Sequence, residues 1–468
     1  MNFFDRKYFP YFILFSIVLF SRLPFLAAGY GVEEDSWGIA LAGFHTKITG
    51  IYEPSRFPGH PVHEFIYSAF WGYSAFLYNL ITAIFSAIAA VFFAIVLKEL
   101  HFKCFFIAAL AFAFTPVYFI SSTYTIDFVW TITFILVSFY FVLKKKFFFC
   151  GVFLGLAIGC RITSGAMLIP FVIIFWQKNN ISENAKRLFK IILPLLLTVL
   201  IAYLPLITEF GLSFFMYYDQ FPYPSLAKVF YKMIPGVFGF FGMAAIAVSI
   251  VWIIFNCKRS PKGVLFEKQP DNKIFIACYA VILLFVVSYF RLPQKSGYMI
   301  TVIPFLILLF GYYLNEKWFQ LLCFSLMISS FFCSINLTDK LRGASFSNYA
   351  ITMTVSGQEL FFDPFSGPVF SDYSKRLQKI KYTNDVILQA DSMTIKTIVI
   401  AGWWYNQIMV TLIPKKNNDL VVFEPYINSV KLDEYVSNGY VIKYLPEQNI
   451  YNDQMYKMDY TDKISTPF

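Results

Sequence analysis

The sequence predicts a polytopic α-helical membrane protein of about eleven spans, followed by a small C-terminal α/β domain. Two observations predict the membrane part. Hydrophobic residues make up 58% of the 468 residues and charged residues only 14%, and apolar runs close to span length recur as far as Ile335. A third observation predicts the second part, because an ordinary polar composition returns after Ile335 and no further apolar run of that length follows.

A helix crosses the roughly 30 Å of bilayer hydrocarbon with about 20 apolar residues. The runs that approach this length are Tyr8–Ala28, Ser74–Leu97, Cys104–Ile120, Phe128–Leu143, Phe147–Cys160, Ser164–Trp176, Ile191–Thr208, Pro235–Asn256, Ile274–Phe290, Tyr298–Leu314 and Trp318–Ile335. The fifth and sixth of these runs are short. They are interpreted either as two thin spans or as one helical hairpin that does not cross fully.

The loops between these runs alternate between basic and acidic. The basic set consists of Arg6-Lys7, Lys98–Lys103, Lys144–Lys146, Lys178–Lys190, Lys258–Lys273 and Lys317. The positive-inside rule places these loops, and therefore the N-terminus, on the cytoplasmic side of a cell membrane. The net charge of +10 follows from them, and because the cations form no continuous basic face, no nucleic-acid partner is expected.

The odd number of spans places the C-terminal domain on the outer, extracytoplasmic side. Residues 1–335 are expected to form the transmembrane module and residues 336–468 the C-terminal domain. Strands and helices alternate in that domain, which predicts an α/β layer with a partly parallel sheet. The expected elements are helices at Ser371–Asp391, Asn406–Leu412 and Val430–Ser437, and strands at Lys396–Ala401, Asp419–Phe423 and Tyr440–Tyr444.

The outer loop at residues 29–73 carries the densest polar cluster of the membrane part. Glu33, Glu34 and Asp35 stand directly before an expected interfacial helix, Ser36–Thr49. A carboxylate there can act as a general base on a hydroxyl group or bind a divalent cation. The alternative is a solvated acidic cluster at a helix N-terminus, where the helix dipole favours negative charge. The residues alone leave both interpretations open.

Further along this loop, two prolines and a glycine surround Arg56 and His60 and predict a rigid turn near the membrane. Arg56 suits a phosphate, because its guanidinium can donate two parallel hydrogen bonds. His60 and His63, three residues apart, could meet a phosphate or a metal ion. Alternatively, the histidines of such a turn only donate hydrogen bonds to the backbone.

Three other predicted outer loops contribute candidate residues. Asp127 stands at the start of the fourth run and either caps that helix or faces Asp35 across a cavity. Arg161, between the fifth and sixth runs, and Arg291 and Lys295, before the tenth, are cations that could hold a lipid-linked phosphate or simply be solvated.

Several motifs resemble those of the multi-spanning GT-C glycosyltransferases, and the closest branch is the bacterial dolichyl-phosphate-mannose/aminoarabinose-transferase type. The resemblance covers roughly residues 1–335 and depends on the order of the motifs along one topology. They are Glu34-Asp35-Ser36 after the first span, the Pro58-Gly59-His60-Pro61 turn before the second, a Ser-rich loop ending in Asp127, the set Gly151, Gly155, Ala157 and Arg161, and the late set Arg291, Pro293, Tyr298 and Pro304.

The resemblance implies a polyprenyl-phosphate-linked sugar donor and transfer to a glycan, lipid or protein acceptor on the outer face of the membrane. Asp35 would be the catalytic base, with Asp127 as the second acidic residue and Glu34 assisting. The residues expected to bind substrate or phosphate are Arg56, His60, His63, Arg161, Arg291, Lys295 and Tyr298. Many family members have glutamate where this chain has Ser36, so a divalent cation (Mg²⁺ or Mn²⁺) on Asp35 and Asp127 stays open.

Two other functions compete with the transferase. A flippase or transporter of lipid-linked saccharides would place ionisable groups near the membrane midplane, whereas the predicted spans are almost free of charge in their middles. A polysaccharide polymerase or ligase would share the outer cavity and the lipid-phosphate substrate. It differs in using a long glycan on a diphosphate, and the sequence does not decide between the two donors.

Overall fold

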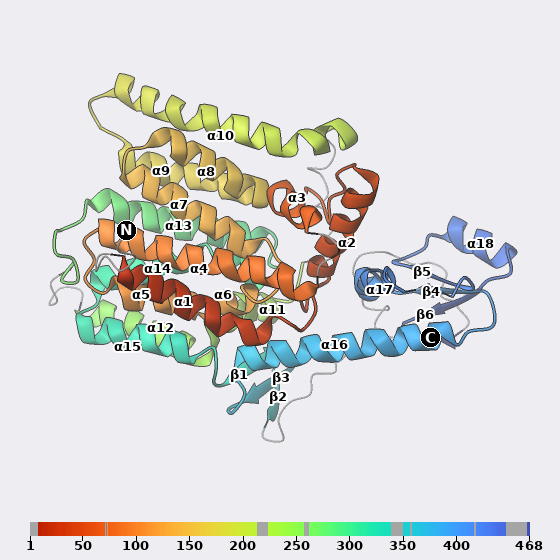
Figure 1. Ribbon diagram of the computed structural model, residues 1–468. Coiled ribbons are helices and arrows are strands. Elements are labelled where there is room, and N and C mark those ends of the chain that lie inside the picture. Colours follow the sequence, from red (N-terminus) through yellow and green to blue (C-terminus); the bar gives the residue numbers. More distant parts are fainter. Residues whose placement is uncertain are drawn as a thin grey trace.

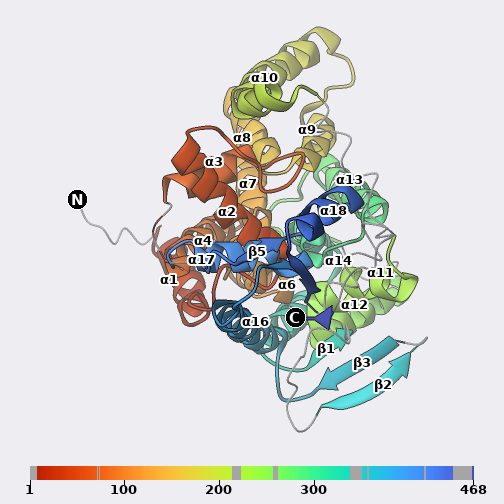
Figure 2. The ribbon, with the colours of Figure 1, turned by 90° about the vertical axis from the view of Figure 1, so that its right-hand side faces the viewer.

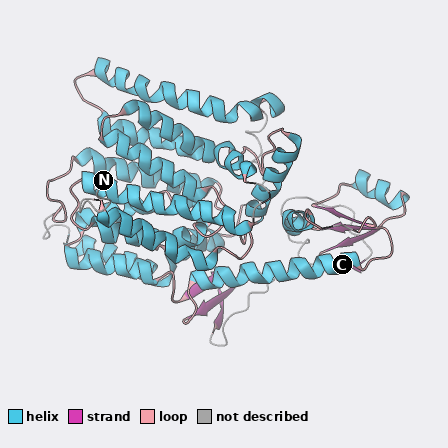
Figure 3. Cartoon of the chain, in the orientation of Figure 1, coloured by secondary structure: helices cyan, strands magenta, loops and turns pink. Residues whose placement is uncertain are grey.

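The computed structural model describes residues 8–70, 72, 74–212, 223–256, 262–337, 350–355, 358–415, 418–445 and 466–468. Arg6, Lys7 and Lys258, which support the predicted orientation, and Tyr73, at the end of the outer loop, lie outside these residues. The described helices form a bundle, and the long helix α16 (Pro368–Asp391) leads from one end of it to a small α/β unit (Figures 1 and 3). The polytopic helical fold with a small C-terminal α/β part is therefore confirmed.

The bundle helices follow the order of the predicted apolar runs. They are α1 (Phe9–Arg22) with η1 (Leu23–Phe25), α4 (Ala75–Glu99), α5 (Phe105–Ala113), α6 (Pro116–Ser121), α7 (Phe128–Leu143), α8 (Phe147–Cys160), η2 (Ile162–Met167), α9 (Leu168–Phe175), α10 (Ile181–Phe210), α12 (Pro235–Asn256), α13 (Asn272–Arg291), η4 (Ser296–Met299), α14 (Val302–Tyr313) and α15 (Glu316–Ile328). Among the described helices, α4, α10, α12 and α13 are long and apolar enough to cross a membrane unaided. The count of about eleven spans includes shorter helices that do not meet that length.

Three predicted boundaries were wrong, each for a local reason. The third run is broken into α5 and α6 because Pro116 has no backbone N–H to continue a helix and instead starts the next one. The helix α10 starts at Ile181, well before the apolar run, because the Asn180 side chain caps it by accepting from the Glu183 N–H. The last run ends in a strand, since Ile335 belongs to β1 (Ser334–Leu337).

The predicted inner and outer loops gather at opposite ends of the bundle. At one end the two basic segments pair, with the Lys103 N–H donating to the Leu265 carbonyl and the Glu267 N–H to the His101 carbonyl, both at 2.9 Å. The other end carries α2 (Glu34–Thr49), α3 (Pro61–Ala69) and the C-terminal part (Figure 1). This separation agrees with the charge pattern, while the assignment of one end to the cytoplasm stays a prediction.

Close packing of α8 places the predicted Arg161 segment beside α3. A Cβ on Gly151 would stand 2.2 Å from the Ile191 carbonyl oxygen of α10, so only glycine permits this approach. In the last turn of α8, a Cβ on Gly159 would meet the Val62 side chain of α3 at 2.4 Å. The small residues of α8 therefore draw the end that leads to Arg161 against the helix that follows the His60 turn.

The C-terminal part contains two sheets. In the first, β1 pairs with β3 (Gln358–Asp363), which pairs with β2 (Ile351–Val355), all antiparallel. In the second, β4 (Thr397–Ile400) lies between β5 (Val421–Glu424) and β6 (Val441–Tyr444), parallel to both, and β7 (Thr466–Pro467) pairs with β6, also in parallel. The crossovers contain α17 (Tyr405–Leu412) and α18 (Ser429–Ser437). The second sheet and its helices agree with the predicted order, and the antiparallel sheet was not predicted.

This α/β part contacts the end of the bundle that carries α2. The helix α17 packs against α2, and α16 packs against α6, as the end-on view shows for α2 and α17 (Figure 2). The Lys379 ammonium of α16 donates to the Val32 carbonyl at 2.7 Å, directly before the acidic cluster. The C-terminal domain therefore supports the segment that carries the candidate base.

Candidate active site

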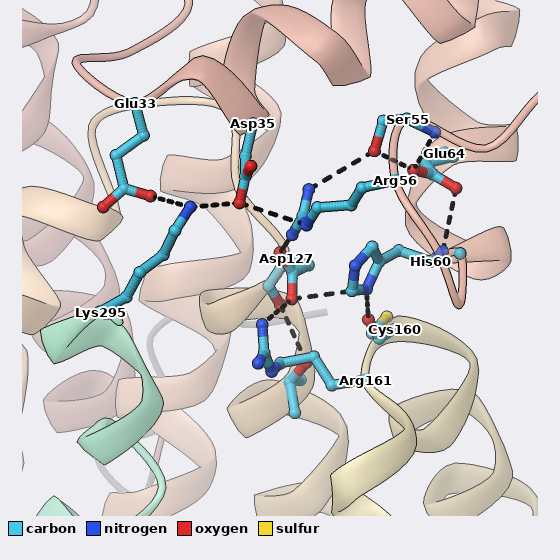
Figure 4. A network of polar contacts seen from close by, with 12 residues as sticks. Glu33, Asp35, Ser55, Arg56, His60, Glu64, Asp127, Cys160, Arg161 and Lys295 are labelled. Carbon is cyan, nitrogen blue, oxygen red and sulfur yellow. Dashed lines mark hydrogen bonds and ion pairs between the residues drawn. The ribbon is translucent and has the colours of Figure 1, made fainter. Parts of the chain in front are cut away.

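Three consecutive carboxylates begin the helix after the first span. Glu33 occupies the N-cap position of α2, and Glu34 and Asp35 lie in its first turn, where the helix dipole favours negative charge. They point in different directions. Glu33 and Asp35 face Lys295 (Figure 4), whereas Glu34 accepts from the Asn406 amide of α17 at 3.4 Å. The cluster is therefore not merely solvated, because each member contacts a residue distant in sequence.

The charges of this end form an alternating series of carboxylates and cations. The Lys295 ammonium lies 2.6 Å from the Glu33 carboxylate and also donates to Asp35. The Asp35 carboxylate in turn lies 3.2 Å from Nε of Arg56, whose Nη2 lies 2.7 Å from Oδ1 of Asp127. Arg56 therefore joins the two aspartates that the sequence singled out (Figure 4).

Asp127 stands at the buried centre of this series. Its side chain is fully buried, and its second oxygen, Oδ2, lies 2.7 Å from Nη1 of Arg161. It occupies the N-cap position of α7, yet its side chain caps no backbone N–H of that helix. The alternative in which Asp127 serves only as a cap is therefore excluded, since its two oxygens bind the guanidinium groups of Arg56 and Arg161.

A buried glutamate, Glu64, holds the Pro-Gly turn in place. Its Oε1 accepts from the Ser55 N–H and its Oε2 from the His60 N–H, both at 3.0 Å, and the Ser55 and Tyr52 hydroxyls also donate to it. These bonds fix the backbone on both sides of Arg56. The turn predicted from its prolines and glycine is thus anchored by a residue of α3.

Two buried arginines hold the loop at residues 121–127. Arg22, at the end of α1, donates from Nε to the Ser122 hydroxyl at 2.9 Å. Arg376 of α16 donates from Nη1 to the Thr123 carbonyl and from Nη2 to the Thr123 hydroxyl, both at 3.1 Å. The position of Asp127 therefore depends on both the first span and the C-terminal domain.

The alternating charges decide the ionisation of the site. Burial raises the pKa of Asp35, but Arg56 and Lys295 outweigh it and lower that pKa to about 2. Burial likewise acts against ionisation of Asp127, yet His60, Arg161 and Arg56 hold its pKa well below the ordinary range. Lys295 is affected in the opposite sense, because Asp35 and Glu33 overcome the effect of burial and raise its pKa. All three groups are therefore charged near neutral pH.

A cavity of about 520 Å³ opens beside this series. It is bounded by the end of α13, by η2 and η4, and by the start of α7. The residues that line it are Pro58, His60, Phe128, Thr131, Arg161, Ile162, Thr163, Phe285, Ser288, Tyr289, Arg291, Leu292, Gly297, Tyr298 and Thr301. The Arg161 guanidinium carbon lies 4.6 Å from the Phe128 ring centroid and 4.7 Å from that of Tyr298. Arg161 thus reaches from Asp127 to the cavity wall.

The structure brings most of the predicted site residues together in two connected groups. Asp35, Arg56, Asp127 and Lys295 belong to the alternating series. His60, Arg291 and Tyr298 line the cavity, and Arg161 belongs to both groups. His63 belongs to neither group, because its ring packs 4.6 Å from the Tyr67 ring and 5.2 Å from the Trp130 ring. Glu34 is directed toward the C-terminal domain.

A divalent cation on Asp35 and Asp127 does not fit this arrangement. Arg56 already lies between the two carboxylates, and each of them also pairs with another cation. Among the described residues, no group of three or more histidine, cysteine, aspartate or glutamate side chains could hold a metal ion. A divalent cation between Asp35 and Asp127 would meet the positive charge of Arg56.

Three residues of the site were given no role of their own from the sequence. Glu64 had a signal, because an acidic residue in the first turn of a helix that starts with proline often contacts the helix N-terminus. Arg22 also had one, since an arginine at the end of an apolar run needs a partner. Arg376 had none, because its spacing to Asp372 is typical of an exposed ion pair on a helix surface.

Comparisons with known proteins identify the fold. Neither a protein-family model nor a curated protein sequence matches the chain. A solved structure does match, namely ArnT from Cupriavidus metallidurans bound to undecaprenyl phosphate, with a TM-score of 0.55, 13% sequence identity and coverage of 94% of each chain. The resemblance seen in the sequence therefore holds in three dimensions, and this multi-pass membrane chain has the fold of ArnT.

Proposed function

We propose that this protein is a membrane glycosyltransferase that moves a sugar from a polyprenyl-phosphate donor to an acceptor on the outer face of the membrane. The observation that carries the proposal is the cavity with Arg161 and Arg291 in its wall, beside the series that contains Asp35 and Asp127. The fold it shares with ArnT, which was solved with undecaprenyl phosphate, supports the same class of donor.

The cavity suits a ligand with a charged head and an apolar tail. Its volume lies within the range of about 300–1,000 Å³ that is typical of small-molecule sites. Guanidinium groups from Arg161 and Arg291 supply charge, and the rings of Phe128 and Phe285 supply apolar wall. A sugar phosphate would therefore lie toward the arginines and the first isoprene units against the aromatic side chains.

The helix α13 offers the tail a path to the bilayer. Phe285 and Ser288 on one side of this helix line the cavity, while Leu283 and Val287 on the other side are exposed. In a membrane these exposed apolar residues face lipid. A polyprenyl chain that leaves the cavity beside α13 would meet these apolar residues.

The reaction requires one bond to break and one to form. The acceptor hydroxyl oxygen attacks the anomeric carbon, the bond from that carbon to the phosphate oxygen breaks, and the lipid phosphate leaves with the electron pair. Arg161 and Arg291 can stabilise the charge that develops on this leaving group. Because a phosphate leaves as an anion, it needs no proton from a general acid.

Asp35 can accept the proton of the acceptor hydroxyl, as the sequence resemblance implies. With both Arg56 and Lys295 bound to it, the pKa of Asp35 is about 2, so it is a weak base in this state. The negative charge of a bound donor would compete for the same two cations. Asp35 therefore gains basicity only when a donor draws Arg56 or Lys295 away, which couples donor binding to proton transfer.

The proposed function is tested by sugar transfer in membranes that contain the protein. Donors are polyprenyl-phosphate monosaccharides with a radiolabelled sugar, and wild type is compared with Asp35→Asn and with Glu53→Gln. Glu53 is a matched control because it lies in the same outer loop but is exposed, and its carboxylate pairs with His45 at 2.8 Å. We expect wild type and Glu53→Gln to transfer label. In Asp35→Asn the rate of transfer should fall at least about 100-fold, the lower end of what general-base catalysis contributes.

Three results would contradict parts of the proposal in different ways. Retained transfer in Asp35→Asn would remove Asp35 from the role of base but leave the transferase intact. Label that only changes leaflet, equally in all three proteins, would instead indicate a flippase. Transfer from a long glycan on a polyprenyl diphosphate, with none from the monophosphate sugar, would indicate a polymerase or ligase.

A further inference from the structure

His60 is held rigidly at the boundary between the charged series and the cavity. It is the N-cap residue of α3, its side chain is almost fully buried, and its backbone N–H donates to Glu64. Its ring nitrogen Nδ1 lies 2.5 Å from the Cys160 carbonyl oxygen and 3.7 Å from Oδ2 of Asp127. The ring therefore has a fixed orientation before any ligand binds (Figure 4).

The contact with Cys160 determines which ring nitrogen carries the hydrogen. A carbonyl oxygen can only accept, so Nδ1 must be the donor. Burial and the nearby charge of Arg56 outweigh the effect of Asp127 and Glu64 and lower the pKa of His60 below its ordinary value, which favours the neutral ring. In the neutral ring with a hydrogen on Nδ1, the other nitrogen, Nε2, carries a lone pair and can only accept.

Nε2 has no partner within the described protein. It is buried and lacks any hydrogen bond, although His60 lines the cavity. A buried polar atom without a partner destabilises the protein, and one in a cavity wall is satisfied when a ligand supplies the missing group. The residues of the cavity wall thus include one with an unpartnered acceptor, Nε2 of His60, as well as two with guanidinium donors, Arg161 and Arg291.

We propose that Nε2 of His60 accepts a hydrogen bond from a hydroxyl or amino group of the sugar that the cavity binds. This inference rests on the proposed function and assigns His60 to the sugar rather than to the phosphate. A phosphate offers mainly oxygen lone pairs, which a neutral Nε2 repels, whereas the guanidinium groups of Arg161 and Arg291 are donors that match it. Within the expectation that His60 binds substrate or phosphate, this proposal selects the sugar.

Binding measurements on two variants test this role. Asparagine at position 60 can still donate to the Cys160 carbonyl but does not reach the place of Nε2, whereas glutamine is long enough to put an amide oxygen there. The probes are polyprenyl phosphate without sugar and polyprenyl-phosphate monosaccharides, titrated into purified protein in detergent. We expect His60→Asn to weaken binding of the sugar-bearing lipids about 10-fold, as for one hydrogen bond, with unchanged affinity for the sugar-free lipid. His60→Gln should recover part of the loss.

The matched control is His45→Asn, which makes the same substitution in the same outer loop. The Nδ1 of His45 is also hydrogen-bonded, to Glu53 at 2.8 Å, but His45 is exposed and lies outside the cavity wall. Its replacement should change neither affinity. In addition, polyprenyl-phosphate deoxy sugars can be titrated into the wild-type protein, and one of the series should bind about 10-fold more weakly than the parent sugar. The affinity for that deoxy sugar should not fall further in His60→Asn.

The outcomes separate this inference from the proposed function. An equal loss for lipids with and without sugar in both His60 variants would show that the residue binds phosphate or only maintains the fold. Unchanged affinity for every probe would remove His60 from recognition altogether, while the transferase proposal would stand. Failure of wild type to bind any of the probes would overturn both.

Discussion

Replacement of Asp127 by asparagine tests whether buried ion pairs hold the site together. Each Asp127 oxygen lies 2.7 Å from a guanidinium nitrogen, of Arg56 and of Arg161. At an effective dielectric constant of about 20, each pair has roughly 6 kcal/mol of Coulomb energy, before the cost of desolvating the ions is subtracted. Asparagine keeps the volume but removes the charge shared by both arginines. Because each arginine side chain is still 17–18% exposed, we expect a loss near the lower end of the range of about 3–5 kcal/mol for a broken buried pair.

The assay is thermal unfolding of the purified protein in detergent, with Glu99→Gln as the control. Glu99 and Lys144 also lie 2.7 Å apart, but their side chains are 34% and 37% exposed, so breaking this pair should cost less than about 1 kcal/mol. With an unfolding entropy of about 2.1 cal/mol/K per residue, a loss of about 3 kcal/mol lowers the midpoint temperature by roughly 3 °C. Equal shifts in the two variants, or no shift in Asp127→Asn, would refute the argument that burial decides the strength of the pairs.

Four further results are expected. Arg291→Gln should weaken binding of polyprenyl phosphate about 10-fold or more without changing the midpoint temperature, because Arg291 lines the cavity and makes no ion pair with a described residue. Arg376→Lys should lower both stability and transfer, because an ammonium cannot reproduce the two bonds to Thr123; transfer that stays at the wild-type level would separate α16 from the site. The pKa of Asp35 falls from its ordinary 3.8 to about 2 on folding, so its contribution to stability is complete above about pH 4 and is lost as the pH falls through 2. Unfolding measured across this interval should therefore show a smaller acid effect in Asp35→Asn, and no difference in pH slope between pH 5 and 8. A divalent-metal chelator should leave transfer unchanged, because Arg56 fills the space between Asp35 and Asp127; loss of transfer that added Mg²⁺ restores would contradict this.

Composition and charge pattern were sufficient to predict the fold class, because a bilayer constrains both of them. A bilayer requires long apolar runs, and the positive-inside rule orders the loops, so the helices appear in the predicted sequence. The ends of the helices were less predictable, since hydropathy does not show where a helix stops or starts within or beside an apolar run. Pro116 divides an apolar run, and Asn180 caps α10 before its apolar part begins. The short strands β1–β3 lie outside regular alternation with helices and gave no signal.

Most members of the site could be named from the sequence, but their partners could not. Lys295 and Asp35 are 260 residues apart, and nothing in a single sequence relates two loops at that separation. Asp127 was expected to cap a helix or to face Asp35 across a cavity. It does neither, because Arg56 lies between the two carboxylates. Arg376 shows the same limit, since only tertiary packing buries a residue whose spacing to Asp372 is typical of a solvated helix face.

The charges of the site favour an anion as its ligand. Glu33, Lys295, Asp35, Arg56, Asp127 and Arg161 alternate in sign, so the series as a whole carries no net charge. Arg291 adds a positive charge to the cavity wall that no described carboxylate neutralises. A bound cation would increase this excess of positive charge, whereas a phosphate would neutralise it. The phosphate could also attract Arg161 away from Asp127. The same anion would weaken the hold of Lys295 and Arg56 on Asp35, so the group that attracts the donor also controls the basicity of the candidate catalytic residue.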